Sequence, residues 1–348
     1  MGSLDSLAIP KGSTVLVTGA NGLVGSHIAD QFLTYGYKVH GTVRNPEKTS
    51  WLADVFDKNH GKGAFELFKV PDMTTEGAFD EAVKGVSTVA HSASVMSLDF
   101  NPHNVIPIAV AGAINALKAA AAVTSTLGVP GMAVTEEIWN EDAVKEAWAE
   151  PPYTPERILA VYAASKTQAE QEVWKYHQEH RSERPDLVVN TGKSSSWMLP
   201  NVNFGKSVDP VHQGFPSSAG IPALLWKGEV TDIHHLMPPQ YFIDAQDTGR
   251  LHVAAGILER VQGQRILGFA QRFSWDSLLE AMRGIEPGRK FPENFSGGED
   301  PNEILPRDKA EQLLRDLGRQ GWTSLEESIR GLVEGLHVAE KAATARGN

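Results

Sequence analysis

The sequence predicts an α/β fold with a doubly wound parallel sheet, followed by a smaller C-terminal lobe. Its first half alternates short β-branched runs with helical patterns, which is typical of strands joined by crossover helices. One strand-to-helix turn carries three spaced glycines. Beyond residue 200 the chain has more Pro and Gly, shorter patterns and no second glycine-rich turn of this kind. We therefore expect two domains, residues 1–200 and residues 201–348.

The individual elements follow from hydrophobic periodicity. Residues 14–18 (TVLVT) suit a buried strand, and residues 23–35 have helical spacing that ends at Gly36, a residue type favoured just after a helix. The same patterns predict further strands at residues 38–43, 65–70, 87–93 and 187–190, and helices at residues 105–122 and 160–179. The last forty residues predict surface helices over the sheet edge, because charged residues flank a Leu/Ile stripe.

Composition excludes several classes of protein. Of 348 residues, 41% are hydrophobic and 22% are charged, as in ordinary globular proteins. Lys and Arg total 32 against 43 Asp and Glu, and the net charge of −11 disfavours a nucleic acid partner. The absence of Cys excludes disulfides, thiolate nucleophiles and Cys-containing zinc sites. No signal-peptide pattern opens the chain and no stretch approaches roughly 18 apolar residues, so we expect a soluble cytoplasmic protein without a membrane partner.

Gly19, Gly22 and Gly25 form the segment that we call the glycine turn. Small residues at this spacing let the chain turn tightly, bring backbone N–H groups against a pyrophosphate and pack the helix on the strand. The helix N-terminus adds partial positive charge. Because the turn lies between a predicted strand and a predicted helix, it indicates a Rossmann-type dinucleotide site.

Two side chains predict which dinucleotide binds, and a third predicts a contact with its adenine. At the end of the second strand of such a fold, a carboxylate would hold a ribose 2′-hydroxyl, whereas an arginine would accept a 2′-phosphate. This chain has Arg44 there, Lys48 one turn later and no acid between residues 38 and 46. NADP(H) is therefore favoured as the cofactor. Asp72, just beyond the third predicted strand, is placed to accept from the adenine amino group.

Tyr162 and Lys166 predict the chemistry. Their spacing of four residues places both side chains on one face of a predicted helix. A neighbouring ammonium stabilises a phenolate and lowers the tyrosine pKa from about 10, which suits proton transfer to a carbonyl oxygen. The hydride would come from the nicotinamide. The pair is evidence for this chemistry only in a chain that also has a dinucleotide-binding fold.

Together these residues resemble the extended short-chain dehydrogenase/reductase superfamily, and within it the dihydroflavonol-reductase-like branch of fungal aldehyde and ketone reductases. The motifs that carry the resemblance are VTGANGLVGSHI (17–28), GTVRN (41–45), VAHSAS (89–94), INALKAAA (114–121), VYAASKTQAE (161–170), LPNVNFG (199–205) and MPPQYFIDAQDTGRLHV (237–253). The resemblance implies reduction of an aldehyde or ketone with NADPH. It also implies that Lys166 bonds the nicotinamide ribose and that Pro200 packs near the nicotinamide.

The chain departs from this family in two segments. Relatives have a strand after the INALKAAA-type helix, and its last serine binds the substrate oxygen. We therefore expect that fifth strand and its serine to be missing here, with Ser125 or Thr126 as candidates to replace the hydroxyl. The second departure is an insertion at residues 192–198, which contains Ser194 to Ser196, hydroxyls that could also substitute.

We hypothesise that one imperfect gene model or splice variant explains both departures, because Gly-Lys-Ser is what an unremoved intron beginning GGTAAGT would encode. A transcript that encodes both segments as written would contradict this idea. A parallel sheet without an interior strand would leave backbone groups unpaired at about 1 to 3 kcal/mol each, so we expect reduced stability and reduced activity.

Several further residues are of types found in metal sites, proton relays or substrate pockets. His234 and His235 lack a third ligand at metal-binding spacing, so a metal site is not expected. His91 is more consistent with packing beside the cofactor than with proton transfer. Asn115 could either bind a water that relays protons to Lys166 or pack between helices. Three residues of the lobe could line an apolar substrate pocket, although such side chains are more often core: Trp226, Met237 and Tyr241.

Two rival functions remain open. Nucleotide-sugar epimerases and dehydratases also carry a Tyr-Lys pair, but they usually retain their cofactor and use NAD. The second rival is a binding or regulatory protein without catalytic activity, because we expect the strand that carries the catalytic serine to be missing.

Overall fold

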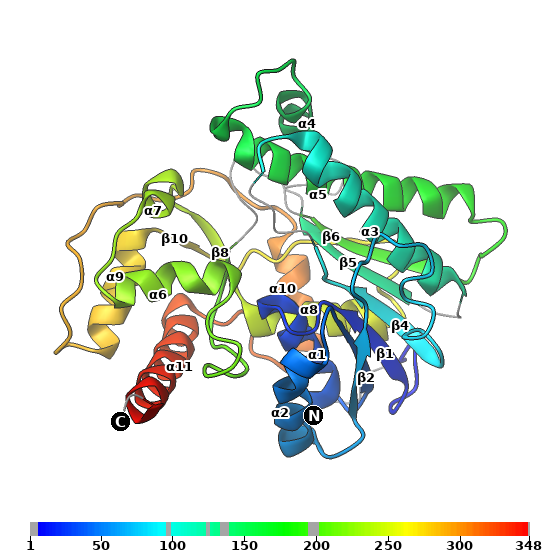
Figure 1. The fold of residues 1–348 in the computed structure, drawn as a ribbon, viewed down its shortest axis with the longest axis horizontal. Coiled ribbons are helices and arrows are strands. Elements are labelled where there is room, and N and C mark those ends of the chain that lie inside the picture. Colours follow the sequence, from blue (N-terminus) through cyan, green and yellow to red (C-terminus); the bar gives the residue numbers. More distant parts are fainter. Residues whose placement is uncertain (1–5, 95–98, 123–125, 133–138, 194–201, 347–348) are drawn as a thin grey trace.

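The computed structural model describes residues 6–94, 99–122, 126–132, 139–193 and 202–346, and it contains two sheets (Figure 1). The larger sheet has the strand order β3-β2-β1-β4-β5-β6-β9, and every pairing in it is parallel. Its strands are β1 (Thr14–Thr18), β2 (Lys38–Val43), β3 (Phe65–Lys69), β4 (Val86–His91), β5 (Thr126–Met132), β6 (Val188–Lys193) and β9 (Arg265–Ile266). The predicted α/β class and parallel sheet are confirmed.

Helices cover both faces of this sheet. One face packs against α3 and α5, and the other packs against α1, α2 and α8 (Ala245–Ile257), with α10 (Arg307–Asp316) outside α8 (Figure 1). The helices of the first half are α1 (Leu23–Thr34), α2 (Ser50–His60), α3 (Pro102–Ala122), α4 (Glu141–Ala147) and α5 (Ile158–Glu179). Strand order reverses beside β1, which lies between β2 and β4, so the carboxyl ends of β1 and β4 flank the crevice where ligands bind in such sheets.

The expectation that the fifth strand is absent from the sheet is wrong. β5 fills the interior position, with Thr126 paired with Thr88 of β4 and with Val188 of β6. Its sequence, TLGVPGM, resembles a loop, but an interior position offers hydrogen-bond partners on both sides, and this outweighs poor strand propensity. The register shifts between Val129 and Met132, around Pro130 and Gly131. The sheet therefore does not carry the predicted gap.

The expected insertion begins inside a strand. Gly192 and Lys193 are the last residues of β6, and Gly192 pairs with Ile266. Residues 194–198, the remainder of that segment, lie outside the described residues.

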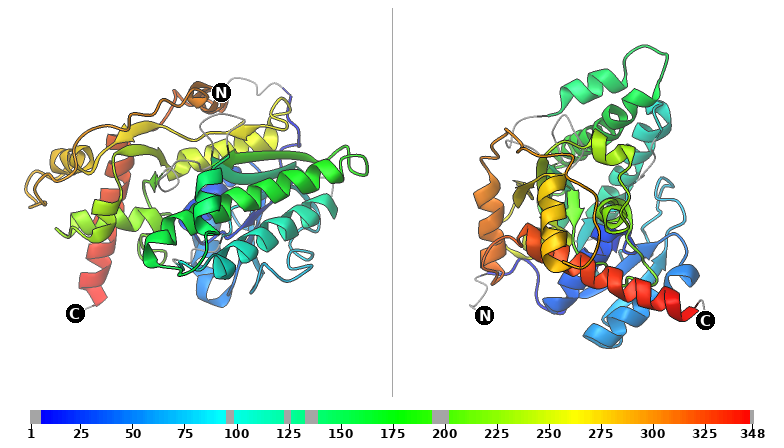
Figure 2. Two further views of the ribbon diagram at one scale, coloured as in Figure 1. Left: turned by 90° about the horizontal axis from the view of Figure 1, so that it is seen from above. Right: turned by 90° about the vertical axis from the view of Figure 1, so that its left-hand side faces the viewer.

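The smaller sheet, of order β10-β8-β7, is the centre of the lobe. Its elements are β7 (Val202–Phe204), α6 (Gly220–Trp226), α7 (Asp232–Leu236), β8 (Gln240–Asp244), β10 (Gln271–Phe273), α9 (Trp275–Ile285) and α11 (Leu325–Arg346). The helix α11 packs against α9, β7 and β8, within the lobe rather than over the large sheet (Figure 2).

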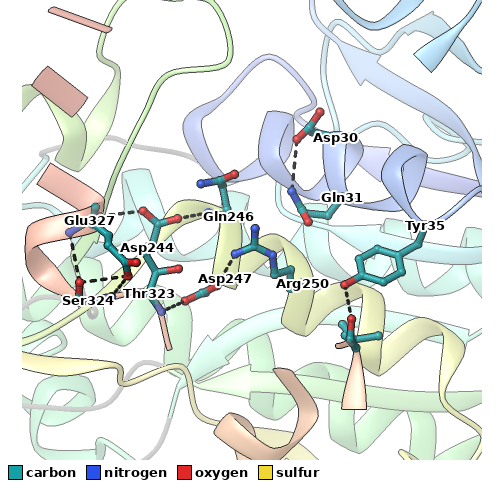
Figure 3. Close-up of polar contacts among 12 residues, drawn as sticks. Asp30, Gln31, Tyr35, Asp244, Gln246, Asp247, Arg250, Thr323, Ser324 and Glu327 are labelled. Carbon is teal, nitrogen blue, oxygen red and sulfur yellow. Dashed lines mark hydrogen bonds and ion pairs between the residues drawn. The ribbon is translucent and has the colours of Figure 1, made fainter. Parts of the chain in front are cut away.

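Two later segments return to the large sheet. The helix α8 (Ala245–Ile257) packs on α1, and β9 pairs with β6. A buried polar network holds α8 to the chain before α11 (Figure 3): Asp247 accepts from Arg250 Nη1 and from the Thr323 amide, each at 2.6 Å. Asp244 caps α8 by accepting from the Gln246 amide at 2.8 Å. The lobe is thus fixed against the sheet that carries the glycine turn.

A second buried ion pair ties α5 to the sheet. Arg265 Nε of β9 donates to Glu170 Oε1 at 2.9 Å, and Thr191 Oγ1 of β6 donates to the same oxygen at 2.8 Å. The side chains of Arg265 and Glu170 are only 6% and 4% exposed. The Arg265 guanidinium also lies 4.2 Å from the Trp139 ring centroid.

One helix of the large domain combines length with high hydropathy. Residues Pro102–Ala121 of α3 are long and apolar enough to cross a membrane by length and composition, with a mean hydropathy of 1.4. Half of that stretch is buried inside the protein, and α3 packs along α5. The core helix of a globular protein passes the same test.

Candidate active site

The glycine turn needs glycine at two of its three positions. Gly19 has φ +66°, and a Cβ there would lie 3.0 Å from the Ala93 Cα. A Cβ on Gly25 would lie 2.2 Å from the Gly19 carbonyl oxygen. Gly22 is the N-cap of α1, and no side chain caps that helix. The first amides of α1 therefore have no side-chain acceptor, which suits a pyrophosphate.

Gln213, a residue that sequence analysis missed, holds the back of this turn. Its Nε2 donates to the carbonyl oxygens of Asn21 and Gly22, both at 3.2 Å, and to Ser26 Oγ at 2.9 Å. Its Oε1 accepts from Ser207 Oγ at 2.7 Å and from the Val208 amide at 3.0 Å. No local pattern could have revealed this role, because Gln213 lies 191 residues from Gly22 in sequence. The lobe thus fixes where the carbonyls of the turn point.

Two basic side chains lie just beyond β2, as predicted. Arg44 directly follows the strand and is exposed, and Lys48 is exposed within the short helix Glu47–Thr49. Neither side chain forms an ion pair with another described residue. Two unpaired cations at the carboxyl edge of the sheet are a suitable donor set for a phosphate.

Asp72 is exposed and lies on the loop after β3. Its Oδ1 accepts from the Thr74 amide at 2.8 Å and from Thr74 Oγ1 at 2.7 Å, and these bonds lower the pKa of Asp72. Asn115 Nδ2 donates to the carbonyl oxygens of Met73 and Thr75, both at 3.0 Å. Asn115 therefore anchors this loop, and the proton-relay alternative for it finds no support.

Tyr162 and Lys166 face each other on α5. Lys166 Nζ lies 5.1 Å from the centroid of the Tyr162 ring, and both residues are half-buried. Burial raises the pKa of Tyr162 to about 12 and lowers the pKa of Lys166 to about 8. The expected lowering of the tyrosine pKa is thus wrong for this structure, because loss of hydration outweighs the nearby amine.

The loop after β4 contacts this pair. Lys166 Nζ donates to Ser94 Oγ. Thr18 Oγ1 accepts from the amides of Ser92, at 3.1 Å, and Ala93, at 3.0 Å. Its own proton is then available for His91 Nδ1, 2.9 Å away. Burial, and secondarily the charge of Lys166, lower the pKa of His91 to about 4, so His91 is a neutral packing residue at pH 7.

Among the described residues, none of the hydroxyls expected to replace the family's serine lies at this site. Thr126 is the first residue of β5 and lies at its amino end, whereas the glycine turn follows the carboxyl end of the parallel strand β1. It therefore cannot replace the expected serine. Pro200, Ser125 and the segment Ser194 to Ser196 lie outside the described residues.

The other candidates of the lobe are structural. His234 is buried, and its Nδ1 accepts from the Thr231 amide at 3.1 Å in the capping box of α7. Across the part of the chain that the structure describes, no group of His, Cys, Asp or Glu could hold a metal ion. Three side chains are 1–5% exposed and belong to hydrophobic clusters rather than to an open surface: Trp226, Met237 and Tyr241.

The chain is similar to a protein family model and to two named reductases. Residues 15–199 match the model of the NAD dependent epimerase/dehydratase family. Aldehyde reductase 2 of Sporidiobolus salmonicolor is 38% identical over 335 residues, which cover 91% of this chain and 94% of the relative. Ketoreductase adrE of Penicillium rubens is 35% identical over 330 residues, which cover 88% of this chain and 91% of the relative.

A solved structure has the same fold. Yeast methylglyoxal/isovaleraldehyde reductase Gre2, complexed with NADPH, superposes with a TM-score of 0.72 at 23% identity. The match covers 94% of this chain and 99% of that one.

Proposed function

The chain belongs to the NAD dependent epimerase/dehydratase family, and on that premise we propose that it uses NADPH to reduce a small-molecule aldehyde or ketone to an alcohol. The observation that carries the proposal is the Tyr162–Lys166 pair, whose amine is bonded to a loop that lies against the glycine turn. Relatives named as an aldehyde reductase and a ketoreductase support it. So does the NADPH bound to the structural neighbour.

The residues present suit this cofactor. The uncapped start of α1 and the glycine turn would hold the pyrophosphate. Arg44 and Lys48 would hold the 2′-phosphate and Asp72 the adenine, with its Oδ2 not used by Thr74. Pro200 would pack near the nicotinamide, as in the family. When bound, NADPH supplies the hydride.

Tyr162 would donate the proton to the oxygen of the substrate. With a pKa of about 12 its phenol stays protonated at neutral pH, which is the form an acid needs. Lys166, with a pKa of about 8, is mostly an ammonium at pH 7 and stabilises the phenolate that proton donation leaves. Reduction should therefore be supported below pH 8 and decline as Lys166 loses its proton above it.

The rival enzyme class remains an NAD-dependent epimerase or dehydratase on this scaffold. Arg44 and Lys48 disfavour it, because they follow β2 where a carboxylate would select the unphosphorylated ribose. The second rival is a binding protein without activity. The interior strand β5 removes the missing strand as an argument for it, but β5 carries no serine, so turnover distinguishes the two functions.

Incubation with NADPH and a panel of aromatic aldehydes and β-keto esters tests the proposal. We expect NADPH consumption that matches the amount of alcohol formed, and slower turnover with NADH. Cofactor binding without consumption on any member of the panel would contradict it. Interconversion of sugar nucleotides without net cofactor oxidation would support the rival.

Arg44→Ala should raise the KM for NADPH roughly 10- to 100-fold, because hydrogen bonds to charged groups contribute about 1.5 to 3 kcal/mol. The KM for NADH should stay within about 2-fold, since that cofactor has no 2′-phosphate. Steady-state kinetics with both cofactors measures this. Lys38→Ala, an exposed cation at the opposite end of β2, is the matched control. Equal losses with both cofactors would argue against phosphate recognition by Arg44.

Gln213→Leu should weaken NADPH binding by roughly 10-fold, because the carbonyls of Asn21 and Gly22 lose their donor and the glycine turn can reorient. Titration of intrinsic tryptophan fluorescence with NADPH measures the affinity without turnover. Gln262→Leu is the control, since among the described residues its Nε2 donates to the nearby Glu259 carbonyl and not to the glycine turn. An unchanged affinity would mean that this contact does not shape the site.

A further inference from the structure

The two residues before Ser94 are hydrogen-bonded to β1. Both donate their amides to Thr18 Oγ1, and Ser92 Oγ donates to the Thr18 carbonyl at 2.6 Å. The adjacent Ala93 lies against Gly19, since a Cβ on that glycine would be 3.0 Å from the Ala93 Cα. The position of the Ser94 hydroxyl is therefore set by β1 and the glycine turn, not by a free loop.

The ammonium of Lys166 has few partners. Among the described residues its one hydrogen bond goes to Ser94 Oγ, and no carboxylate there pairs with it. The groups that face it are the Tyr162 ring of α5 and the neutral His91 of β4. Neither offers negative charge at pH 7. A hydroxyl oxygen that accepts from an ammonium stabilises its charged form.

Among the described residues, β5 supplies no serine at the place where the family resemblance implies one. β5 is present, but its sequence TLGVPGM carries no hydroxyl side chain after Thr126 at its amino end. Ser94 follows β4, the neighbour of β5, and its hydroxyl is the one that the described structure brings to the Tyr162–Lys166 pair.

We propose that Ser94 is a positioning residue that keeps Lys166 charged and directed at Tyr162 during carbonyl reduction. This inference rests on the proposed function. Ser94 acts through Lys166, so its loss should alter the pH dependence of turnover more than turnover at low pH.

The test compares kcat between pH 6 and pH 10 in the parent protein, Ser94→Ala and Ser94→Thr. In the alanine variant the alkaline limb should move down by about one pH unit, since a hydrogen bond to a charged group of about 1.5 kcal/mol corresponds to about one unit. At pH 8.5 kcat should fall roughly 10-fold, and at pH 6 less than about 3-fold. Ser94→Thr keeps the acceptor and should retain the parent profile.

Ser92→Ala is the matched control, because it loosens the same loop without removing a partner of Lys166. Its alkaline limb should not move. An unchanged limb in Ser94→Ala, or an equal shift in Ser92→Ala, would overturn the proposal.

A second measurement separates this proposal from the proposed function. Competitive labelling with acetic anhydride, read by peptide mass spectrometry across pH, gives the pKa of Lys166 without turnover. A lower pKa in Ser94→Ala supports the role of Ser94 in holding the charge even if no carbonyl is reduced. An equal pKa in both proteins refutes that role even if reduction is observed.

Discussion

Tyr162→Phe should reduce kcat for carbonyl reduction roughly 10²- to 10⁴-fold, because that is the typical contribution of a positioned general acid. The substitution removes the hydroxyl and keeps the ring, so NADPH affinity should stay within about 2-fold. The ring also remains available to the Lys166 ammonium 5.1 Å away. Single-turnover measurement of NADPH oxidation separates the chemical step from binding.

Tyr176→Phe provides the comparison. This residue lies on the same helix, fourteen positions and about 21 Å farther along it, with its ring stacked on His180 at 3.9 Å. Its kcat should match that of the parent. Equal rates for Tyr162→Phe and the parent would remove Tyr162 as the proton donor and leave the proposed mechanism without an acid.

Glu170→Ala should lower the free energy of unfolding by about 3 to 5 kcal/mol. The change leaves the guanidinium of Arg265 buried without its carboxylate, and removal of one partner from a buried ion pair typically has this effect. It also takes an acceptor from Thr191. Denaturation in urea, followed by circular dichroism, measures the change.

Glu172→Ala is the control for this prediction. Glu172 is on the same helix, but its pair with Lys175 is exposed, with side chains 45% and 60% accessible, so its loss should cost less than about 1 kcal/mol. Similar stabilities for both variants would mean that the buried pair contributes nothing beyond a surface pair. A fall in kcat at unchanged stability in Glu170→Ala would instead assign Glu170 to the active site.

The pattern of the first half was sufficient to predict most of its elements. The residues of β1, α1 and β2 lie within a few positions of their predicted bounds, and Gly36 has φ +87° after the end of α1. These features are local: alternation, helical spacing and a glycine after a helix depend on neighbouring residues only. The glycine turn, Arg44 and Lys48 could be placed at one edge of the sheet, because each follows a predicted strand and parallel strands bring their carboxyl ends to the same edge.

Tertiary structure decided the rest. The sequence of residues 126–132 predicts a loop, yet these residues form the strand β5 between β4 and β6. The backbone groups of β4 and β6 need hydrogen-bond partners inside the sheet, and β5 supplies them. The spacing of Tyr162 and Lys166 suggested an acidic phenol, but burial by distant segments raises its pKa. Ser94 reaches Lys166 across 72 residues and Gln213 reaches Gly22 across 191. Sequence alone determined which residue types stand at the carboxyl edge of the sheet. Only the folded chain determined which of them touch and how strongly each is desolvated, because both depend on neighbours that are remote in sequence.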